Sequence, residues 1–185
     1  MSDLSLRPLD ICSDPVPLPS PERIPAIAAA LSRSWRCAVL QRTDLRIERA
    51  IDGRFIVQRL KESGRPKRTY YNTGYAHGSL ADALASSALG YGFMIDEADL
   101  GLPVDERAKT VVITMLIDFF RAAQAAGVAA SYHFRPWVGA HLRHRTVFYA
   151  ADLDRRGYRR EIVFRSASAR DALMAGCQFL STLDY

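Results

Sequence analysis

The chain has 185 residues and a formal net charge of +5, with 49% hydrophobic and 24% charged residues. These proportions are those of a globular protein and exclude a wholly disordered chain, and the length allows one domain or two small ones. The positive charge favours acidic partners, among which nucleic acid is one candidate.

The N-terminal region is expected to form an extended or flexible arm over residues 1–20, because three prolines between positions 15 and 19 forbid regular structure. Ser20 then caps a helix that begins at Pro21 and ends near Ser34. We predict a short strand over residues 35–41. The arm lacks the apolar core of a signal peptide, and we expect a soluble, cytoplasmic protein.

Three antiparallel strands follow, and their predicted ranges are 45–51, 54–61 and 67–73. Asp52 and Gly53 supply a two-residue hairpin turn between the first two strands. A helix over residues 78–89 completes the pattern. Residues 21–90 are therefore predicted to form one helix–three-strand–helix unit, which an acidic connector over residues 91–103 follows.

The second half of the chain repeats this order. A long helix over residues 104–126 ends at Gly127. The strands after it are predicted at residues 129–137, 143–152 and 158–164. A last helix begins at Ser168, so residues 104–185 are predicted to form a second helix–three-strand–helix unit.

The two halves also resemble each other where their last helices begin. Ser79 and Ser168 are each followed, after two residues, by Asp-Ala-Leu. We infer a pseudo-duplication and predict an α+β fold of two similar helix–three-strand–helix units around the long central helix. The two units could also form one compact domain.

The long central helix is strongly apolar between Val111 and Phe120, where Thr114 and Asp118 are the only polar residues. A helix that is apolar all round must be covered on several sides. We expect this helix to lie between two sheets or to form a homodimer interface. The apolar stretch is about half as long as a membrane span requires, so we expect no membrane partner.

The stretch FMIDEADL, residues 93–100, resembles the Asp-Glu pair of DEAD-box helicases, which serves Mg²⁺ and water after an apolar strand. That chemistry also needs the phosphate-binding sequence GxxxxGK[ST], and the chain has no Gly-Lys dipeptide. We therefore expect a solvated acidic loop at these residues.

The segment from Tyr132 to Thr146 contains three histidines and three arginines. If His133 and His144 lie on paired strands, their side chains could meet across the sheet and hold a metal. A zinc site normally adds a third or fourth ligand, and no cysteine or carboxylate is near in the sequence. No carboxylate is spaced to orient an imidazole for catalysis. The cysteines form no CxxC pair of the kind that binds zinc. We expect no metal, no cofactor and no catalytic residue.

Positive charge gathers in two strand regions. Residues 133–165 hold eight arginines against three acidic residues, and residues 54–68 hold six basic residues against Glu62, so each region carries +5. Residues 92–126, between them, carry −3. Arginine beside aromatic residues on a sheet suits phosphate contact with base stacking. Because strand residues alternate between two faces, about half of these aromatics could instead lie in the core.

These patterns predict non-catalytic binding of nucleic acid, DNA before RNA, by arginine-rich β-hairpins. The residues expected to bind nucleic acid or an acidic partner are Arg54, Arg59, Lys61, Arg65, Lys67, Arg68, Tyr70, Tyr132, Arg135, Trp137, Arg143, His144, Arg145, Arg155, Arg156, Arg159 and Arg160. An inhibitor or adaptor that docks on an acidic protein surface is the alternative, since arginine and aromatic residues are also favoured at protein interfaces. A hydrolase or nuclease is a third interpretation.

Overall fold

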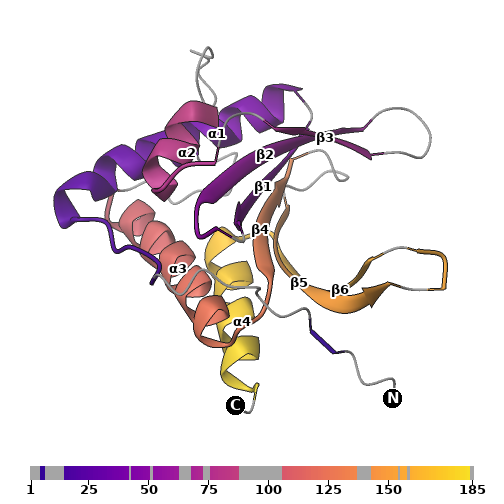
Figure 1. Cartoon of the computed structure of the whole chain (residues 1–185). Helices are drawn as coiled ribbons and strands as arrows, with labels where there is room; N and C mark the ends of the chain where they lie inside the picture. Colours follow the sequence, from indigo (N-terminus) through magenta and orange to yellow (C-terminus); the bar gives the residue numbers. More distant parts are fainter. Residues whose placement is uncertain are drawn as a thin grey trace.

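A computed structural model describes residues 5–6, 15–41, 43–50, 52–62, 68–72, 76–87, 106–136, 143–153, 155–157 and 159–183. Within these residues, strands form one antiparallel sheet of six, and the helices cover one of its faces (Figure 1). The predicted α+β class is confirmed. None of the helices in the described part of the chain is long and apolar enough to cross a membrane.

The elements follow one another in the order that the sequence predicts, apart from the segment after Ser34. Their bounds are α1 (Ile24–Gln41, after a 3₁₀ turn at Pro21–Arg23), β1 (Thr43–Arg49), β2 (Phe55–Glu62), β3 (Arg68–Asn72), α2 (Leu80–Ser87), α3 (Glu106–Ala125), β4 (Ala130–Arg135), β5 (Arg143–Leu153), β6 (Arg159–Ser166) and α4 (Ala169–Ser181).

Helix α1 is longer than predicted, because it continues past Ser34. The strand predicted over residues 35–41 is helical and continues α1 to Gln41. Trp35 and Ala38 are fully buried and extend the helical spacing of the buried Ile27 and Leu31. The run of apolar residues here is typical of a strand, but Trp35 packs on Phe134 of the sheet with ring centroids 5.0 Å apart, and this contact favours the helix.

The sheet has the strand order β3-β2-β1-β4-β5-β6, so the first strands of the two halves meet at its centre (Figure 1). In this antiparallel pairing Arg46 of β1 lies opposite His133 of β4. Helix α1 packs over β1 and β4, α2 over β2, α3 over β4, and α4 over β5 and β6. One continuous hydrophobic core lies beneath all of them.

The helix starts that suggested a duplication have the same cap. The backbone N–H of Asp82 donates to Ser79 Oγ at 3.2 Å, and that of Asp171 donates to Ser168 Oγ at 3.4 Å. Each half also has the order helix, three strands, helix. A common origin of the two halves by duplication stays a prediction.

Helix α3 is not apolar all round, so the expectation of an entirely apolar surface was wrong. Its residues Val112, Ile113, Leu116, Ile117, Phe119 and Phe120 are buried. Val111, Thr114, Asp118 and Arg121 form an exposed stripe at helical spacing. The buried apolar side chains of α3 are covered by the sheet, α1 and α4 of the same chain. The homodimer through this helix stays a prediction, without the all-round apolar surface that motivated it.

Gly176 of α4 lies where the helix layer touches the sheet most closely. A Cβ atom at this position would lie 2.7 Å from Thr146 Oγ1 on β5 and 3.0 Å from a ring carbon of Phe119 on α3. Thr146 Oγ1 also donates to the backbone carbonyl of Ala172 at 3.1 Å, which holds the side chain in place. The glycine therefore sets the distance between α4 and β5.

We expect Gly176→Ala to lower the free energy of unfolding by about 1–2 kcal/mol, although alanine favours helices, because overpacking a core costs about 1–3 kcal/mol. Urea denaturation followed by circular dichroism measures the change. Gly78→Ala is the control, since a Cβ at Gly78 would meet no atom within 4 Å. Equal stability of the two variants would contradict the close packing.

Candidate functional site

Polar and charged side chains gather at the centre of the sheet, on the face opposite the helices. Strand residues alternate between the two faces. Leu45 and Ile47 therefore face the helices, whereas Arg46 faces away from them. The group on the far face, named the sheet-face cluster below, consists of Asp44, Arg46, Glu48, Ser131, His133, Arg135, Arg145 and Tyr149.

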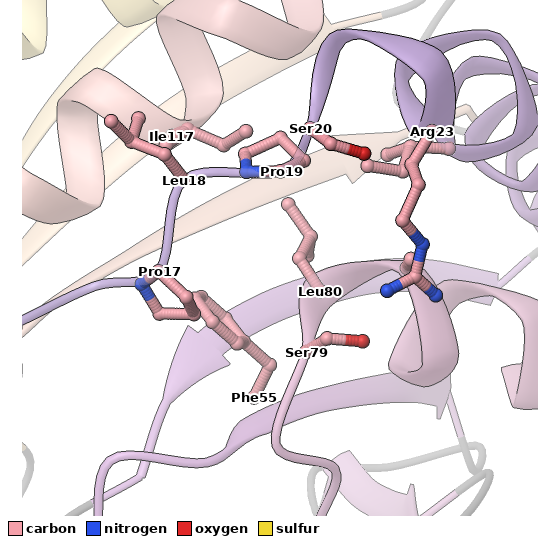
Figure 2. A pocket seen from close by; sticks show the side chains of 11 residues that line it. Pro17, Leu18, Pro19, Ser20, Arg23, Phe55, Ser79, Leu80 and Ile117 are labelled. Atoms are coloured by element: carbon pink, nitrogen blue, oxygen red, sulfur yellow. The ribbon is translucent and has the colours of Figure 1, made fainter.

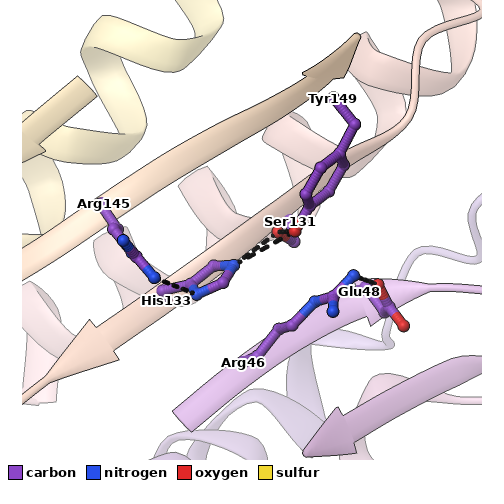
Figure 3. Close-up of polar contacts among 6 residues, drawn as sticks. All are labelled: Arg46, Glu48, Ser131, His133, Arg145 and Tyr149. Atoms are coloured by element: carbon purple, nitrogen blue, oxygen red, sulfur yellow. Dashed lines mark hydrogen bonds and ion pairs between the residues drawn. The ribbon is translucent and has the colours of Figure 1, made fainter. Parts of the chain in front are cut away.

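A chain of hydrogen bonds crosses the cluster from β5 to β4 and back (Figure 3). Arg145 Nη2 donates to His133 Nδ1 at 3.0 Å, and His133 Nε2 lies 2.7 Å from Ser131 Oγ. Ser131 Oγ lies 2.5 Å from the hydroxyl of Tyr149. Because a guanidinium can only donate, Nδ1 accepts, and the neutral imidazole carries its proton on Nε2. His133 therefore donates to Ser131 Oγ.

This arrangement decides what the serine can do. A nucleophilic serine gives its proton to a histidine nitrogen that accepts. In the sheet-face cluster the histidine nitrogen nearest to Ser131 is a donor, which is the reverse arrangement. Burial raises the pKa of Tyr149 to about 12, so this tyrosine stays a neutral phenol at neutral pH. The chain of hydrogen bonds is thus suited to holding β4 and β5 in register.

Ion pairs complete the cluster. Arg135 Nε lies 2.8 Å from Asp44 Oδ2, and Arg145 Nη2 lies 3.8 Å from the same oxygen. Asp44 is fully buried. Arg46 pairs with Glu48, and its guanidinium lies 5.3 Å from the centre of the Tyr149 ring. Three arginines face two carboxylates, so the positive charge of the cluster is largely balanced inside the protein.

Several residues predicted to bind a partner lie in the interior. Arg59 is buried on the helix side of the sheet and donates to Gln41 Oε1 at 2.8 Å. Its guanidinium lies near the thiol of Cys37, whose pKa is raised by burial although the arginine opposes the shift. Arg135 and Arg145 belong to the sheet-face cluster. These arginines hold elements of the same chain together.

His144 and Tyr132 lie in the core between the sheet and α1. The hydroxyl of Tyr132 is 2.6 Å from His144 Nδ1, and the rings of Trp35 and His144 are 4.9 Å apart. Burial raises the pKa of Tyr132 well above its usual value. His144 is opposite Phe134 in the β4–β5 pairing, whereas His133 is opposite Arg145. The two histidines therefore lie on opposite faces of the sheet and cannot share a metal.

The predicted residues that are exposed lie in two hairpin turns, the β5–β6 turn and the β1–β2 turn. Arg155 and Arg156 form its turn with Gly157, which has a positive φ of 78°. Arg160 is half-buried and lies 3.3 Å from Asp152. In the turn before β2, Arg54 is exposed and pairs with Asp52 at 2.5 Å. The side chains of the other predicted residues lie outside the described part of the chain: Lys61, Arg65, Lys67, Arg68, Tyr70, Trp137, Arg143 and Arg159.

The sequence interpretation missed four residues of the sheet-face cluster: Asp44, Arg46, Glu48 and Ser131. A signal for the first three is present, because charged residues occupy every second position of β1. Alternation of this kind predicts one polar face, but it does not show that the polar face is buried. Among the described residues, no group of three histidine, cysteine or acidic side chains could hold a metal ion.

A cavity of about 290 Å³ lies on the other side of the molecule, beneath the segment of residues 17–20 (Figure 2). Its walls are mainly apolar and come from α1, α2, α3 and β2, with Ile27, Phe55 and Leu80 among them. Arg23 and Ser79 lie at one side of it. The segment that covers the cavity is extended, as the prolines predict, and Val16 N–H anchors it to Gln124 Oε1 at 3.0 Å.

No family model, no curated protein and no solved structure matches this chain.

Proposed function

We propose that the protein binds nucleic acid without catalysis, DNA before RNA, and that the turn of the β5–β6 hairpin contacts phosphate groups. The observation that supports this most directly is the exposed pair Arg155 and Arg156. The turn extends away from the helix layer (Figure 1), so a duplex can approach it without meeting the helices. Exposed arginines contact phosphates through paired N–H donors.

The kind of contact follows from where the aromatic residues lie. Tyr132, one of the tyrosines expected to stack on bases, is in the core. Tyr149 is also buried, beneath Arg46. The described residues therefore give little support to base stacking, whereas the exposed turn supports contact with phosphates. Contacts of this type position a protein on a duplex without reading its sequence.

The predicted duplication adds a second contact to the proposal. In the first half, the turn between β2 and β3 corresponds to the β5–β6 turn and contains Arg65 and Lys67, which lie outside the described residues. Arg68 begins β3 beside it. The two turns would contact the same polyanion from the two ends of the sheet.

The test is a titration of labelled duplex DNA at two salt concentrations, with Arg155→Glu/Arg156→Glu as the variant. We expect affinity to fall by about tenfold or more, because each substitution removes one phosphate contact and adds repulsion. The slope of log affinity against log salt concentration should become shallower by about 1.8, because two arginines no longer neutralise phosphates. The variant should keep the stability of the original chain to within about 0.5 kcal/mol per residue.

Arg33→Glu/Arg170→Glu is the matched control, since it changes the net charge equally at exposed positions on α1 and α4. This variant should retain most of the affinity. Equal reductions of affinity in both variants would leave only a general charge effect, which contradicts a hairpin site. If the original chain does not bind duplex DNA at about 50 mM salt, where non-specific contacts are strong, docking on an acidic protein surface would replace this proposal.

A further inference from the structure

Strand β6 forms one end of the sheet, and no described residue pairs with its outer edge (Figure 1). The strand is eight residues long, contains no proline, and includes the apolar run Ile162, Val163 and Phe164. An end strand of this kind presents a row of backbone N–H and C=O groups to any strand that can pair with it.

The side chains of β6 carry two opposite charges at a fixed spacing. Glu161 and Arg165 lie on the face away from the helices, with Val163 between them, and both are exposed. They are four positions apart along an extended strand, about 13 Å, so they cannot pair with each other. Among the described residues, neither takes part in an ion pair.

We propose that β6 pairs with β6 of a second copy of this chain, antiparallel and centred on Val163. In this register Glu161 of each copy is opposite Arg165 of the other, which makes two ion pairs on one face. On the face toward the helices, Ile162 of each copy is opposite Phe164 of the other. The two Val163 side chains meet on the symmetry axis.

Symmetry restricts the alternatives. Residues directly opposite in an antiparallel pair share a face, and a two-fold axis perpendicular to the sheet keeps each residue type on its own face. The axis must therefore pass midway between one residue and the same residue of the other copy. Centring on Glu161 or on Arg165 places like charges opposite each other. Centring on Ile162 or on Phe164 leaves Glu161 without an arginine opposite.

The dimer would join two six-stranded sheets into one, with both helix layers on the same side. The β5–β6 turns of the two copies would lie at opposite ends of the joined strands, because the strands run antiparallel. The proposal does not depend on nucleic-acid binding, since no residue of the β5–β6 turn takes part in the pairing. Opposite-charge and apolar cross-strand pairs each stabilise such a pairing.

The experiment measures molar mass by light scattering after size exclusion, at protein concentrations from about 1 µM to about 1 mM. The original chain should reach the mass of a dimer. Glu161→Arg and Arg165→Glu should each weaken the dimer about tenfold or more, because each places two like-charge pairs across the strands. These two variants change the net charge in opposite directions, so a shared weakening cannot come from net charge.

The charge-swapped variant Glu161→Arg/Arg165→Glu should recover the dimer, because it restores both ion pairs in reverse order. Arg170→Glu, at an exposed position of α4, is the control and should leave the dimer unchanged. Circular dichroism verifies that each variant is folded. A monomer at every concentration, a dimer that survives either single change, or a swapped variant that stays monomeric would each overturn the proposal.

Discussion

Replacing Leu116 with aspartate is expected to unfold the protein at room temperature. Leu116 lies in the core on the buried side of α3, where it is 1% exposed. The substitution removes a buried apolar side chain and places a charge where the surrounding core is hydrophobic. The combined cost of several kcal/mol is comparable with the whole stability of a typical domain, about 5–15 kcal/mol. Far-UV circular dichroism and the thermal melting temperature measure the unfolding.

Val111→Asp is the matched control, because it adds the same charge to the same helix. Val111 is 42% exposed and belongs to the exposed stripe of α3. Its replacement should change the free energy of unfolding by no more than about 0.5 kcal/mol. A Leu116→Asp variant that keeps the original melting temperature would contradict the placement of α3 against the core.

Asp44→Asn should lower the free energy of unfolding by about 3–5 kcal/mol, although the side chain keeps its size. The fully buried carboxylate of Asp44 is close to the guanidinium groups of Arg135 and Arg145. Removing one partner from a buried ion pair leaves the other charge desolvated and uncompensated. Chemical denaturation of the variant measures this change in stability.

Asp152→Asn provides the comparison, since Asp152 pairs with Arg160 at the surface, 3.3 Å away. An exposed pair contributes at most about 1 kcal/mol. The double variant Asp44→Asn/Arg135→Gln should lose less stability than the sum of its two single changes, which reports the coupling between them. Equal small decreases in stability for Asp44→Asn and Asp152→Asn would contradict the buried position of Asp44.

Most of the fold was predictable because local patterns determine it. Gly127, with a positive φ of 61°, ends α3 where the sequence predicted. The serine caps of α2 and α4 are also where their spacing indicated. The error at residues 35–41 arose because apolar residues in a continuous run are compatible with both a strand and a buried helix. Contact of Trp35 with the sheet, which is not local, decides between them.

The site was much less predictable, because charge counts do not show which face a residue occupies. Arg59 follows the buried Phe55 and Val57 at a spacing of two residues along β2, and this spacing places it on the helix side. The strand pattern alone could have identified Arg59 as an interior residue. The pairing of Asp44 with Arg135 could not be found in this way, because it depends on the register between β1 and β4, which are distant in the chain.

The position of β1 beside β4 has a consequence for how quickly the protein folds. Every other strand pairing in the sheet joins strands that follow each other directly in the chain. The β1–β4 pairing instead closes a long loop, and the entropy lost in closing it is regained only when the pairing forms. Contacts between distant residues slow folding, so each three-strand meander should form early and the joining of β1 to β4 should limit the rate. Because the hairpins form before this step, substitutions in the hairpin turns or at the junction should slow folding more than they speed unfolding.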